Sequence, residues 1–541
     1  MPSLIETTTK NDPKKITICG AGLVGCLAAC YFAERDYEVT LYEYRSDIRN
    51  MKVVAGRSIN MAMSVRGREG LKRIGAEESI TSKGIEMYSR MLHDTKGNTQ
   101  AVPYGKRSQC ILSIDRRYLN ELLLNEAEKY PNLTIEFSHK VKKCNTNTGE
   151  VVFENTLTGQ EHHVKSDLVI GCDGAYSSVR QSLLKDKAVD FSQSYNCGYY
   201  LELQIPAKNG TFAMPPKHLH IWPRGDFMLI ALPNQDYTFT CTLFMPLEMF
   251  EKIQTPEQAI DFFEKNFIDA LKLMGNENFV QMYFATKPSS LVSITCNPHH
   301  GNKCVLFGDS AHAMVPFYGQ GMNCGFEDVV VFFEILDSLG FDNIDKVLEK
   351  YSQTRVPDAH AICELAIRNY DEMKYLVTTR GYRLRKKLDS ILNYLFPSSW
   401  VPLYTMVTFT RIRYSEVIEA RKRQDEILRK GGLITGLATL AGLGYFLFKN
   451  KANLLSPILA LKENEGFWYR IWGYWRSPAI MKMNGLWSDR KEQQFKSYLM
   501  SQRGRGKSRP ETMYEKLSQP KYNVKWVKKQ EVAVAQNSIK K

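Results

Sequence analysis

The chain has 541 residues, of which 43% are hydrophobic and 24% are charged, and its formal net charge is +14. This composition is ordinary for a globular protein, and the length allows a large core and several domains. The twelve cysteines include no C-x-x-C pair, which excludes a disulfide framework and a zinc site as predictions, and we expect no metal.

The positive charge gathers in the C-terminal third, in RLRKK, EARKRQ and SQRGRGKSRP, next to apolar runs. This arrangement favours a membrane surface over nucleic acid as the partner. The N-terminal MPSLIETTTKNDPKK is short and polar and contains an acidic residue. It therefore predicts neither a signal peptide nor a transit peptide.

Residues 14–45 have the pattern of a strand, a tight turn, a helix and a second strand. The turn contains Gly20-x-Gly22-x-x-Gly25, in which the glycines allow a sharp turn, close approach of a pyrophosphate and close helix packing. The N-terminus of the following helix offers free N–H groups to phosphates. Glu43 ends the second strand, and its carboxylate suits a ribose diol. The pattern predicts dinucleotide binding and does not separate FAD from NAD.

Residues 100–130 predict a strand and a helix, RRYLNELLLNEAEKY, and residues 133–170 alternate as antiparallel strands do. The buried strand SDLVIGCDG ends in a turn with Asp173, after which Ser177 or Ser178 is placed to cap a helix. Taken alone, this turn is typical of a simple helix cap.

Residues from about 195 to 295 predict successive antiparallel strands and a helix, TPEQAIDFFEKNF, inserted into the first domain. The chain returns at KCVLFGDS, and residues 325–395 are mostly helical in pattern. Two apolar runs follow. The run at 391–409 contains two prolines and predicts a docked or interfacial helix pair, and the run at 431–448 is uncharged over 18 residues and predicts a membrane anchor.

The stretch GDSAHAMVPFYGQGMNCGFED, residues 308–328, places Asp309 at the tip of a strand and a glycine-rich turn before a helix. Asp309 could accept a hydrogen bond from a ribitol or ribose hydroxyl. The turn, from Gly319 to Asn323, could open a helix whose N–H groups stabilise the negative charge of a reduced flavin ring.

These three motifs, in this order, resemble the flavoprotein aromatic hydroxylases. Further stretches, among them RSINMAMSVRGREGLKRIG, SRMLHDTKGNTQAVPYG and HLHIWPRGDFMLIALPN, resemble the kynurenine 3-monooxygenase family within that class. The resemblance covers residues 14–425 and the hydrophobic anchor. It implies an α/β, Rossmann-like FAD-binding domain with an inserted antiparallel sheet. The expected division is 1–195 and 296–365 for the FAD-binding domain, 196–295 for the substrate domain, 366–430 for C-terminal helices that close the site, 431–448 for the transmembrane anchor and 449–541 for a basic tail.

The resemblance also implies the site residues. With the motif positions included, the expected FAD-binding residues are Gly20, Gly22, Val24, Gly25, Tyr42, Glu43, Tyr44, Arg45, Ala62, Arg116, Val141, Asp173, Ser177, Asp309, Gly321, Met322 and Asn323. The expected substrate-binding residues are Arg90, Tyr104, Asn369 and Tyr404, and the loop residues between flavin and substrate are Pro316, Phe317 and Gln320. A guanidinium such as that of Arg90 offers two parallel donors to a carboxylate.

The implied reaction is the NADPH- and O2-dependent hydroxylation of L-kynurenine to 3-hydroxykynurenine, in tryptophan catabolism toward NAD synthesis. The oxygen donor would be a C4a-hydroperoxide of the flavin, so no catalytic side chain is required, and His299, His300 and His312 are expected to be structural. The chain has no second G-x-G-x-x-G, so NADPH would lack a Rossmann domain of its own. The implied location is the mitochondrial outer membrane, with the catalytic part facing the cytosol.

Two alternatives stay open from the sequence. One is a related membrane-bound flavin hydroxylase or epoxidase that acts on another aromatic or apolar substrate, which would not need Arg90. The other is a membrane-anchored flavin-binding protein without turnover.

Overall fold

The computed structural model describes residues 13–51, 60–105, 108–195 and 198–449, except for the side chains at 378, 432–444 and 446–448. Contacts divide the chain into one compact unit that ends at Leu428 and a second unit that starts at Arg429. Every strand of the described residues, and every predicted site residue, belongs to the first unit.

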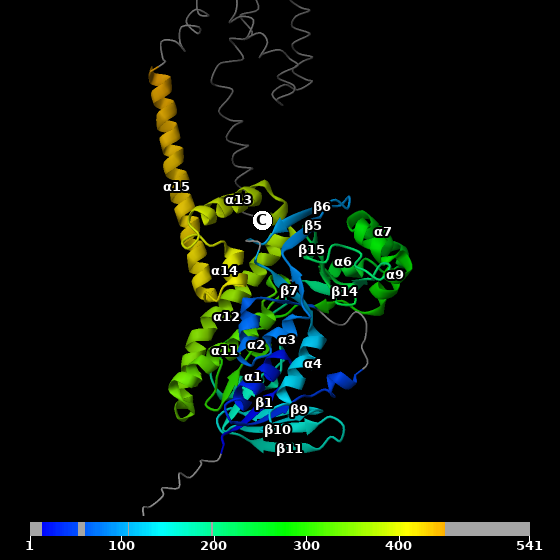
Figure 1. The fold of residues 1–541 in the computed structure, drawn as a ribbon, viewed down its shortest axis with the longest axis vertical. Helices are drawn as coiled ribbons and strands as arrows, with labels where there is room; N and C mark the ends of the chain where they lie inside the picture. Colours follow the sequence, from blue (N-terminus) through cyan, green and yellow to red (C-terminus); the bar gives the residue numbers. More distant parts are fainter. Residues whose placement is uncertain (1–12, 52–59, 106–107, 196–197, 450–541) are drawn as a thin grey trace, which may run out of the picture. The chain divides into compact units, whose positions relative to one another are not determined.

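A five-stranded parallel sheet lies inside the first unit, between helices and the antiparallel strands at the bottom of Figure 1. Its strands are short aliphatic runs that are almost wholly buried, as a sheet covered on both faces requires. In spatial order they are β20 (Cys304–Leu306), β12 (Leu168–Gly171), β1 (Lys15–Cys19), β2 (Glu38–Tyr42) and β8 (Leu133–Glu136). The strand–turn–helix–strand unit predicted over 14–45 is confirmed.

Different layers cover the two faces of this sheet. One face packs against helices α1 (Leu23–Ala33), α4 (Arg116–Ala127) and α11 (Gly321–Leu339), with α2 (Val65–Arg73) beyond α11 and α3 (Glu77–Thr81) next to α2. The other face packs against an antiparallel sheet and one helix, namely β9 (His139–Asn145), β10 (Glu150–Asn155), β11 (Glu161–Lys165) and α5 (Ser178–Asp186).

A seven-stranded sheet forms the second layer system. Its order is β18 (Ser289–Ser290), β14 (Tyr199–Ile205), β17 (Phe239–Met245), β16 (Met228–Pro233), β15 (His218–Pro223), β5 (Ser89–His93) and β6 (Thr99–Pro103). Helices α6 (Leu247–Glu251), α7 (Pro256–Asn266), α8 (Ile268–Met274) and α9 (Asn276–Ala285) cover one face. A capping box, formed by Thr255 and Gln258, starts α7 with proline at its first position.

This sheet extends beyond the predicted insertion at 196–295. Strands β5 and β6 come from residues 89–103, and β5 pairs with β15 in parallel, so the sheet is mixed rather than purely antiparallel. The pairing joins segments more than a hundred residues apart, which no local sequence pattern indicates. A two-stranded ribbon, β13 (Asp190–Ser194) with β19 (Ser293–Asn297), holds the two chain crossings of the insertion together. A small sheet, with the order β3 (Asn60–Met63), β7 (Ile111–Asp115) and β4 (Ile85–Met87), lies between the two large ones.

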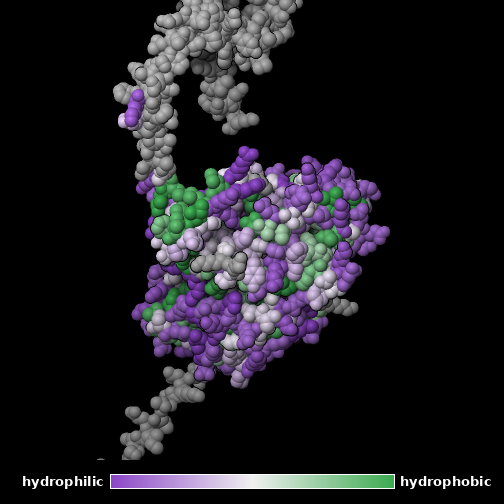
Figure 2. Space-filling model, turned by 45° about the horizontal axis from the view of Figure 1, so that its top comes forward, coloured by the Kyte–Doolittle hydropathy of each residue, from purple (hydrophilic) through white to green (hydrophobic). Residues whose placement is uncertain are grey.

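Four C-terminal helices follow in the first unit, and all but the second of them pack on the other face of the seven-stranded sheet. In chain order the four helices are α12 (Ile344–Lys374), α13 (Arg380–Leu395), α14 (Leu403–Phe409) and the start of α15 (Tyr414–Lys449). Short helical turns elsewhere in the described residues are η1 (Ile48–Asn50), α10 (Asp309–His312), η2 (Pro316–Tyr318), η3 (Phe341–Asn343) and η4 (Leu376–Thr378). The apolar run at 391–409 is broken between α13 and α14, where Pro397 and Pro402 cannot continue a helix. Hydrophobic side chains gather at one end of the surface, as Figure 2 shows.

The predicted anchor at 431–448 has a helical backbone as part of α15, but nearly all of its side chains lie outside the described residues. Within the part of the chain that the structure describes, no helix is long and apolar enough to cross a membrane. The predicted basic tail lies outside the described residues from 450 onward.

Candidate active site

The turn between β1 and α1 contains two glycines that close packing requires, Gly20 and Gly25, and one, Gly22, that faces open space. A Cβ on Gly20, whose φ is +104°, would lie 2.5 Å from the Cys172 carbonyl oxygen, and one on Gly25 would lie 1.9 Å from the Gly20 oxygen. A Cβ on Gly22 would meet no protein atom within 4 Å. Gly22 is the N-cap of α1, and no side chain caps the N–H groups of this helix. The turn therefore leaves backbone donors and room for an anionic ligand.

Glu43 lies directly beside this turn. Its buried carboxylate accepts hydrogen bonds from the Ala21 N–H at 2.9 Å and from Arg45 Nε at 2.7 Å. Tyr44 is exposed, whereas the Tyr42 ring stacks on Phe153 in the core between the two sheets, where burial raises the pKa of Tyr42 to about 12. The strand end thus presents Glu43, Tyr44 and Arg45, but not the side chain of Tyr42.

Three further residues predicted to bind FAD have other surroundings. Val141 packs in the same core as Tyr42. Ser177 caps α5 by accepting from the Arg180 N–H, and Asp173 accepts from the first two N–H groups of that helix, those of Ser178 and Val179. The simple helix cap considered from the sequence is therefore present. The Asp173 carboxylate has a raised pKa because it is buried.

The second glycine turn approaches the first. Gly308 has a φ of +62°, and a Cβ there would lie 3.1 Å from Val24 Cγ2, at the start of α1. A Cβ on Gly325 would lie 2.6 Å from the same atom. Asp309 follows β20 and is exposed. The close approach brings the Asp309 carboxylate to the same edge of the parallel sheet as the Gly22 turn.

The start of α11 is held by Asn323. Its side-chain oxygen accepts from the Ser64 N–H at 2.8 Å, and its amide nitrogen donates to the carbonyls of Ala62 and Gly319 at 2.8 and 2.7 Å. The side-chain amide of Asn323 thus bonds the backbone of β3, of Ser64 after it, and of Gly319 before α11. The first N–H groups of α11, from Gly321 on, have no side-chain cap, so this helix also presents free donors. Met322 belongs to this helix start, and Ala62 contacts it through the bond from Asn323. Arg116 is exposed at the start of α4.

A buried ionic network lies behind α11. The His312 ring is 2.5 Å from Asp328, whose carboxylate also accepts from Arg355, and Arg355 contacts Glu327. Burial alone would raise the pKa of Asp328, but His312 and Arg355 lower it to about 2. His312, Cys324 and Asp328 offer atoms within 4.8 Å of one another, and the Arg355 guanidinium already pairs with this group. The network holds the turn at Gly308 and the first part of α11 together. This arrangement agrees with a structural role for His312.

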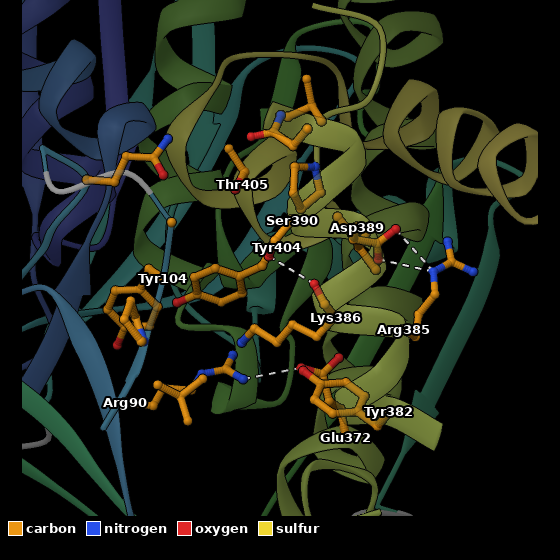
Figure 3. Close-up of a pocket in the computed structure, with 18 of the residues that line it drawn as sticks. Arg90, Tyr104, Glu372, Tyr382, Arg385, Lys386, Asp389, Ser390, Tyr404 and Thr405 are labelled. Carbon is orange, nitrogen blue, oxygen red and sulfur yellow. Dashed lines mark hydrogen bonds and ion pairs between the residues drawn. The ribbon is translucent and has the colours of Figure 1, made fainter. Parts of the chain in front are cut away.

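A cavity of about 810 Å³ lies between the seven-stranded sheet and the C-terminal helices (Figure 3). Arg90 from β5, Tyr104 after β6 and Tyr404 from α14 line it together, as predicted. The Tyr104 and Tyr404 rings stack at 5.1 Å, and the Arg90 guanidinium lies 4.6 Å from the centre of the Tyr404 ring. Arg90 Nε and the Tyr104 hydroxyl are buried without a hydrogen-bond partner. The lining of the cavity therefore includes two buried donors, one on each of these two residues, which both pack against the Tyr404 ring.

Asn369 does not line this cavity within the described residues. Its side chain is buried and donates to the Phe317 carbonyl at 2.7 Å, so it holds η2 to α12. The Phe317 ring stacks on Tyr370 at 4.2 Å. Gln320 accepts from the Tyr414 hydroxyl at 2.9 Å and is almost fully buried. Of the predicted loop residues, Phe317 and Gln320 are thus each held by a C-terminal helix, whereas Pro316 is exposed.

Sequence reasoning missed most of the polar residues that line the cavity, among them Glu372, Tyr382 and Lys386. Glu372 accepts from Arg90 Nη1 at 3.2 Å and from the Tyr382 hydroxyl at 2.5 Å. Lys386 also lines the cavity, and burial together with the neighbouring Arg90 lowers the pKa of Lys386 to about 8. Glu372 could have been found, because it follows Asn369 by three positions on a helix. Tyr382 and Lys386 have no comparable signal, because α13 meets β5 only in the folded chain.

Comparisons with known proteins agree with this geometry. The family model "FAD binding domain" matches residues 14–366. Kynurenine 3-monooxygenase of Caenorhabditis elegans is 49% identical over 457 residues, covering 81% of this chain and 99% of the relative. The same enzyme of Anopheles gambiae is 49% identical over 442 residues, covering 81% and 91%. The solved structure of tetrameric 2-methyl-3-hydroxypyridine-5-carboxylic acid oxygenase shares the fold at a TM-score of 0.55 and 17% identity, covering 69% of this chain and 95% of that one.

Proposed function

Because the chain belongs to the kynurenine 3-monooxygenase family of FAD-binding monooxygenases, we propose that it hydroxylates L-kynurenine to 3-hydroxykynurenine with NADPH and O2. One observation carries the substrate: Arg90 and Tyr104 both line the cavity (Figure 3), and Arg90 Nε and the Tyr104 hydroxyl are buried without a hydrogen-bond partner. A carboxylate on the substrate would satisfy both. Their burial also argues against an apolar substrate, since it would leave these donors unpaired.

The residues at the sheet edge fit FAD. The open Gly22 position and the uncapped start of α1 suit the pyrophosphate, Glu43 suits the ribose, and Asp309 suits a ribitol hydroxyl. The uncapped start of α11 suits the ring edge that gains negative charge. When bound, FAD supplies electron transfer from the nicotinamide to oxygen. The fit rests on open space and free donors, which packing alone does not require.

The side chains of the cavity orient the substrate and exclude water. In the described residues Arg90 pairs with Glu372. A substrate carboxylate would compete for Arg90, which would leave the Glu372 carboxylate beside the α-ammonium group of an amino acid. Tyr318 and Tyr404 stack at 5.6 Å and form an aromatic wall. Such a wall holds an aryl ring and keeps water from the reacting atoms.

Substitution of Arg90 tests this function. Arg90→Met should weaken L-kynurenine binding by about 2–5 kcal/mol, the cost of truncating one partner of a buried charged pair. The control is kynuramine, the analogue that lacks the carboxylate, whose affinity should change little. Binding is followed by the change in FAD absorbance on titration. Equal losses for both ligands would contradict the role of Arg90, and NADPH oxidation that L-kynurenine does not accelerate would contradict the function.

The proposal includes attachment to a membrane through residues 431–448, at the mitochondrial outer membrane with the catalytic part in the cytosol. The uncharged sequence and helical backbone of this segment support the attachment, and the location rests on the family alone. Fractionation of cells that express the full chain and a chain with charged substitutions at Leu440 and Leu443 tests it. An unchanged distribution would exclude the segment as the anchor.

A further inference from the structure

Helix α13 has two faces of different character. The inner face closes the substrate cavity, with Tyr382, Lys386 and Asn393 among the lining residues (Figure 3). On this side Asp389 is buried and accepts from Arg385, Arg421 and the Trp400 indole, which fixes α13 to α15 and to the chain before α14. The inner face therefore explains the position of the helix, but not the composition of the outer face.

The outer face of α13 is a stripe of exposed aliphatic side chains. Leu384, Leu388, Ile391 and Leu395 are 71%, 36%, 57% and 58% exposed. Their spacing of four, three and four residues places them on one line along the helix. Tyr394 and Phe396, also exposed, widen the hydrophobic area at its C-terminal end. Scattered hydrophobic residues on a surface are normal, but a continuous stripe marks an interaction site.

The charged residues that α13 itself places beside this stripe are positive. Arg380, Arg383 and Lys387 recur at three- and four-residue spacing, one step around the helix from the aliphatic line. The one acidic residue of α13 is Asp389, which lies on the inner face. Aliphatic and aromatic residues flanked by arginine and lysine are typical of helices that lie in the headgroup region of a bilayer. Nucleic acid would match the charges but leave the leucines in water.

We propose that the outer face of α13 lies on an anionic lipid bilayer, with the aliphatic stripe among the acyl chains near the headgroups and the basic residues at the lipid phosphates. This contact is separate from the proposed anchor at 431–448 and involves a different part of the chain. The helix that closes the substrate cavity is then also the helix that touches the membrane.

A site-specific fluorophore tests the contact in the full chain. Ile391→Cys is labelled with the environment-sensitive dye NBD, and the matched control is Leu157→Cys, which is 77% exposed between β10 and β11. The labelled but unsubstituted chain gives the background of native cysteines. Vesicles contain phosphatidylcholine with phosphatidylserine, or phosphatidylcholine alone. We expect a blue shift and a several-fold rise in emission at 391 with the anionic vesicles, quenched by spin-labelled lipid, and no change at 157.

Two results would overturn the proposal. Emission at 391 that stays as at 157 would show that the stripe remains in water. A blue shift that spin-labelled lipid does not quench would show that protein, such as the residues after 449, covers the stripe. Since the label reports on α13 itself, both results can be told apart from failure of the proposed enzyme function and from failure of the anchor.

A second comparison tests the role of the basic residues of α13. Arg380→Glu with Lys387→Glu should lower the quenched fraction on anionic vesicles to that on neutral ones. Lys140→Glu with Lys143→Glu, at exposed positions of β9, changes the net charge equally and should have no effect. Equal effects of the two pairs would overturn the role of this face. Thermal melting in detergent checks that each variant is folded.

Discussion

The two glycines Gly22 and Gly25, three residues apart, should respond in opposite ways to alanine, because only one of them faces the ligand. At Gly25 a methyl group would lie 1.9 Å from a backbone oxygen, so the helix or the strand must move. At Gly22 the φ of −74° is open to alanine, and no protein atom lies within 4 Å of the added methyl. Alanine is less favourable than glycine at an N-cap, which lowers stability. This loss opposes a gain in stability of about 0.4–1 kcal/mol, because alanine restricts the unfolded chain. Gly22→Ala should therefore change the stability of the FAD-free protein by less than about 1 kcal/mol.

FAD binding should separate the two variants. The methyl of Gly22→Ala occupies the space that a pyrophosphate needs, and we expect FAD affinity to fall by roughly tenfold to a hundredfold, which is about 1.4–2.8 kcal/mol. Quenching of FAD fluorescence on titration into the FAD-free protein measures this loss, and thermal melting of the same samples measures stability. Gly25→Ala should lower the melting temperature itself. If Gly22→Ala binds FAD as the unchanged chain does, the ligand does not approach this turn and the assignment is wrong.

Three other predictions concern the C-terminal helices and the cavity. Tyr414→Phe removes the hydrogen bond to the buried Gln320 amide, which should cost about 1–3 kcal/mol of stability and raise the NADPH oxidised per molecule of product; an unchanged ratio would show that Gln320 does not need this partner. Lys386, whose pKa is lowered to about 8, loses its charge as pH rises through that value, so affinity for a carboxylate substrate should fall. Over the same range the free energy of unfolding should rise, because the unfolded chain holds this proton to higher pH. Lys386→Met should flatten the pH profiles of affinity and of stability, and profiles identical to those of the unchanged chain would refute the assignment. Arg66→Met breaks the buried pair with Glu327 at 2.5 Å and leaves two carbonyls without this donor, that of Val407 in α14 and that of Ile412 after it. We expect a loss of about 3–5 kcal/mol in urea unfolding, and a loss below 1 kcal/mol would show that the network is dispensable.

Local chemistry explains which parts of the fold could be predicted. The Gly20 turn, the cap at Ser177 and the start of α11 are each determined by residues within a few positions, and the sequence indicated each of them, whereas the capping bonds of Asp173 were not predicted. The parallel pairing of β5 with β15 could not be predicted in this way, because the two strands are more than a hundred residues apart.

The same distinction holds for the candidate site. The meeting of Arg90, Tyr104 and Tyr404 was expected from family resemblance and not from spacing, because three separate elements supply them. Glu372 and Lys386 were missed, since their part in the cavity depends on how α12 and α13 pack against β5. Asn369 was expected to contact the substrate, and its side chain instead holds the Phe317 carbonyl in the described residues.

The mixed sheet has a consequence for engineering and for the divergence of such enzymes. Residues 196–295 could be exchanged as a block with those of another hydroxylase, since both crossings pass through the β13–β19 ribbon. Such a chimera would replace β15, which pairs with β5, yet none of the described residues that line the cavity lies in 196–295, so β5 and β6, with Arg90 and the approach to Tyr104, would remain those of the host. The cavity lining and most of the sheet that supports it are thus inherited from separate stretches of the chain, and the supporting strands can change while the lining residues are kept.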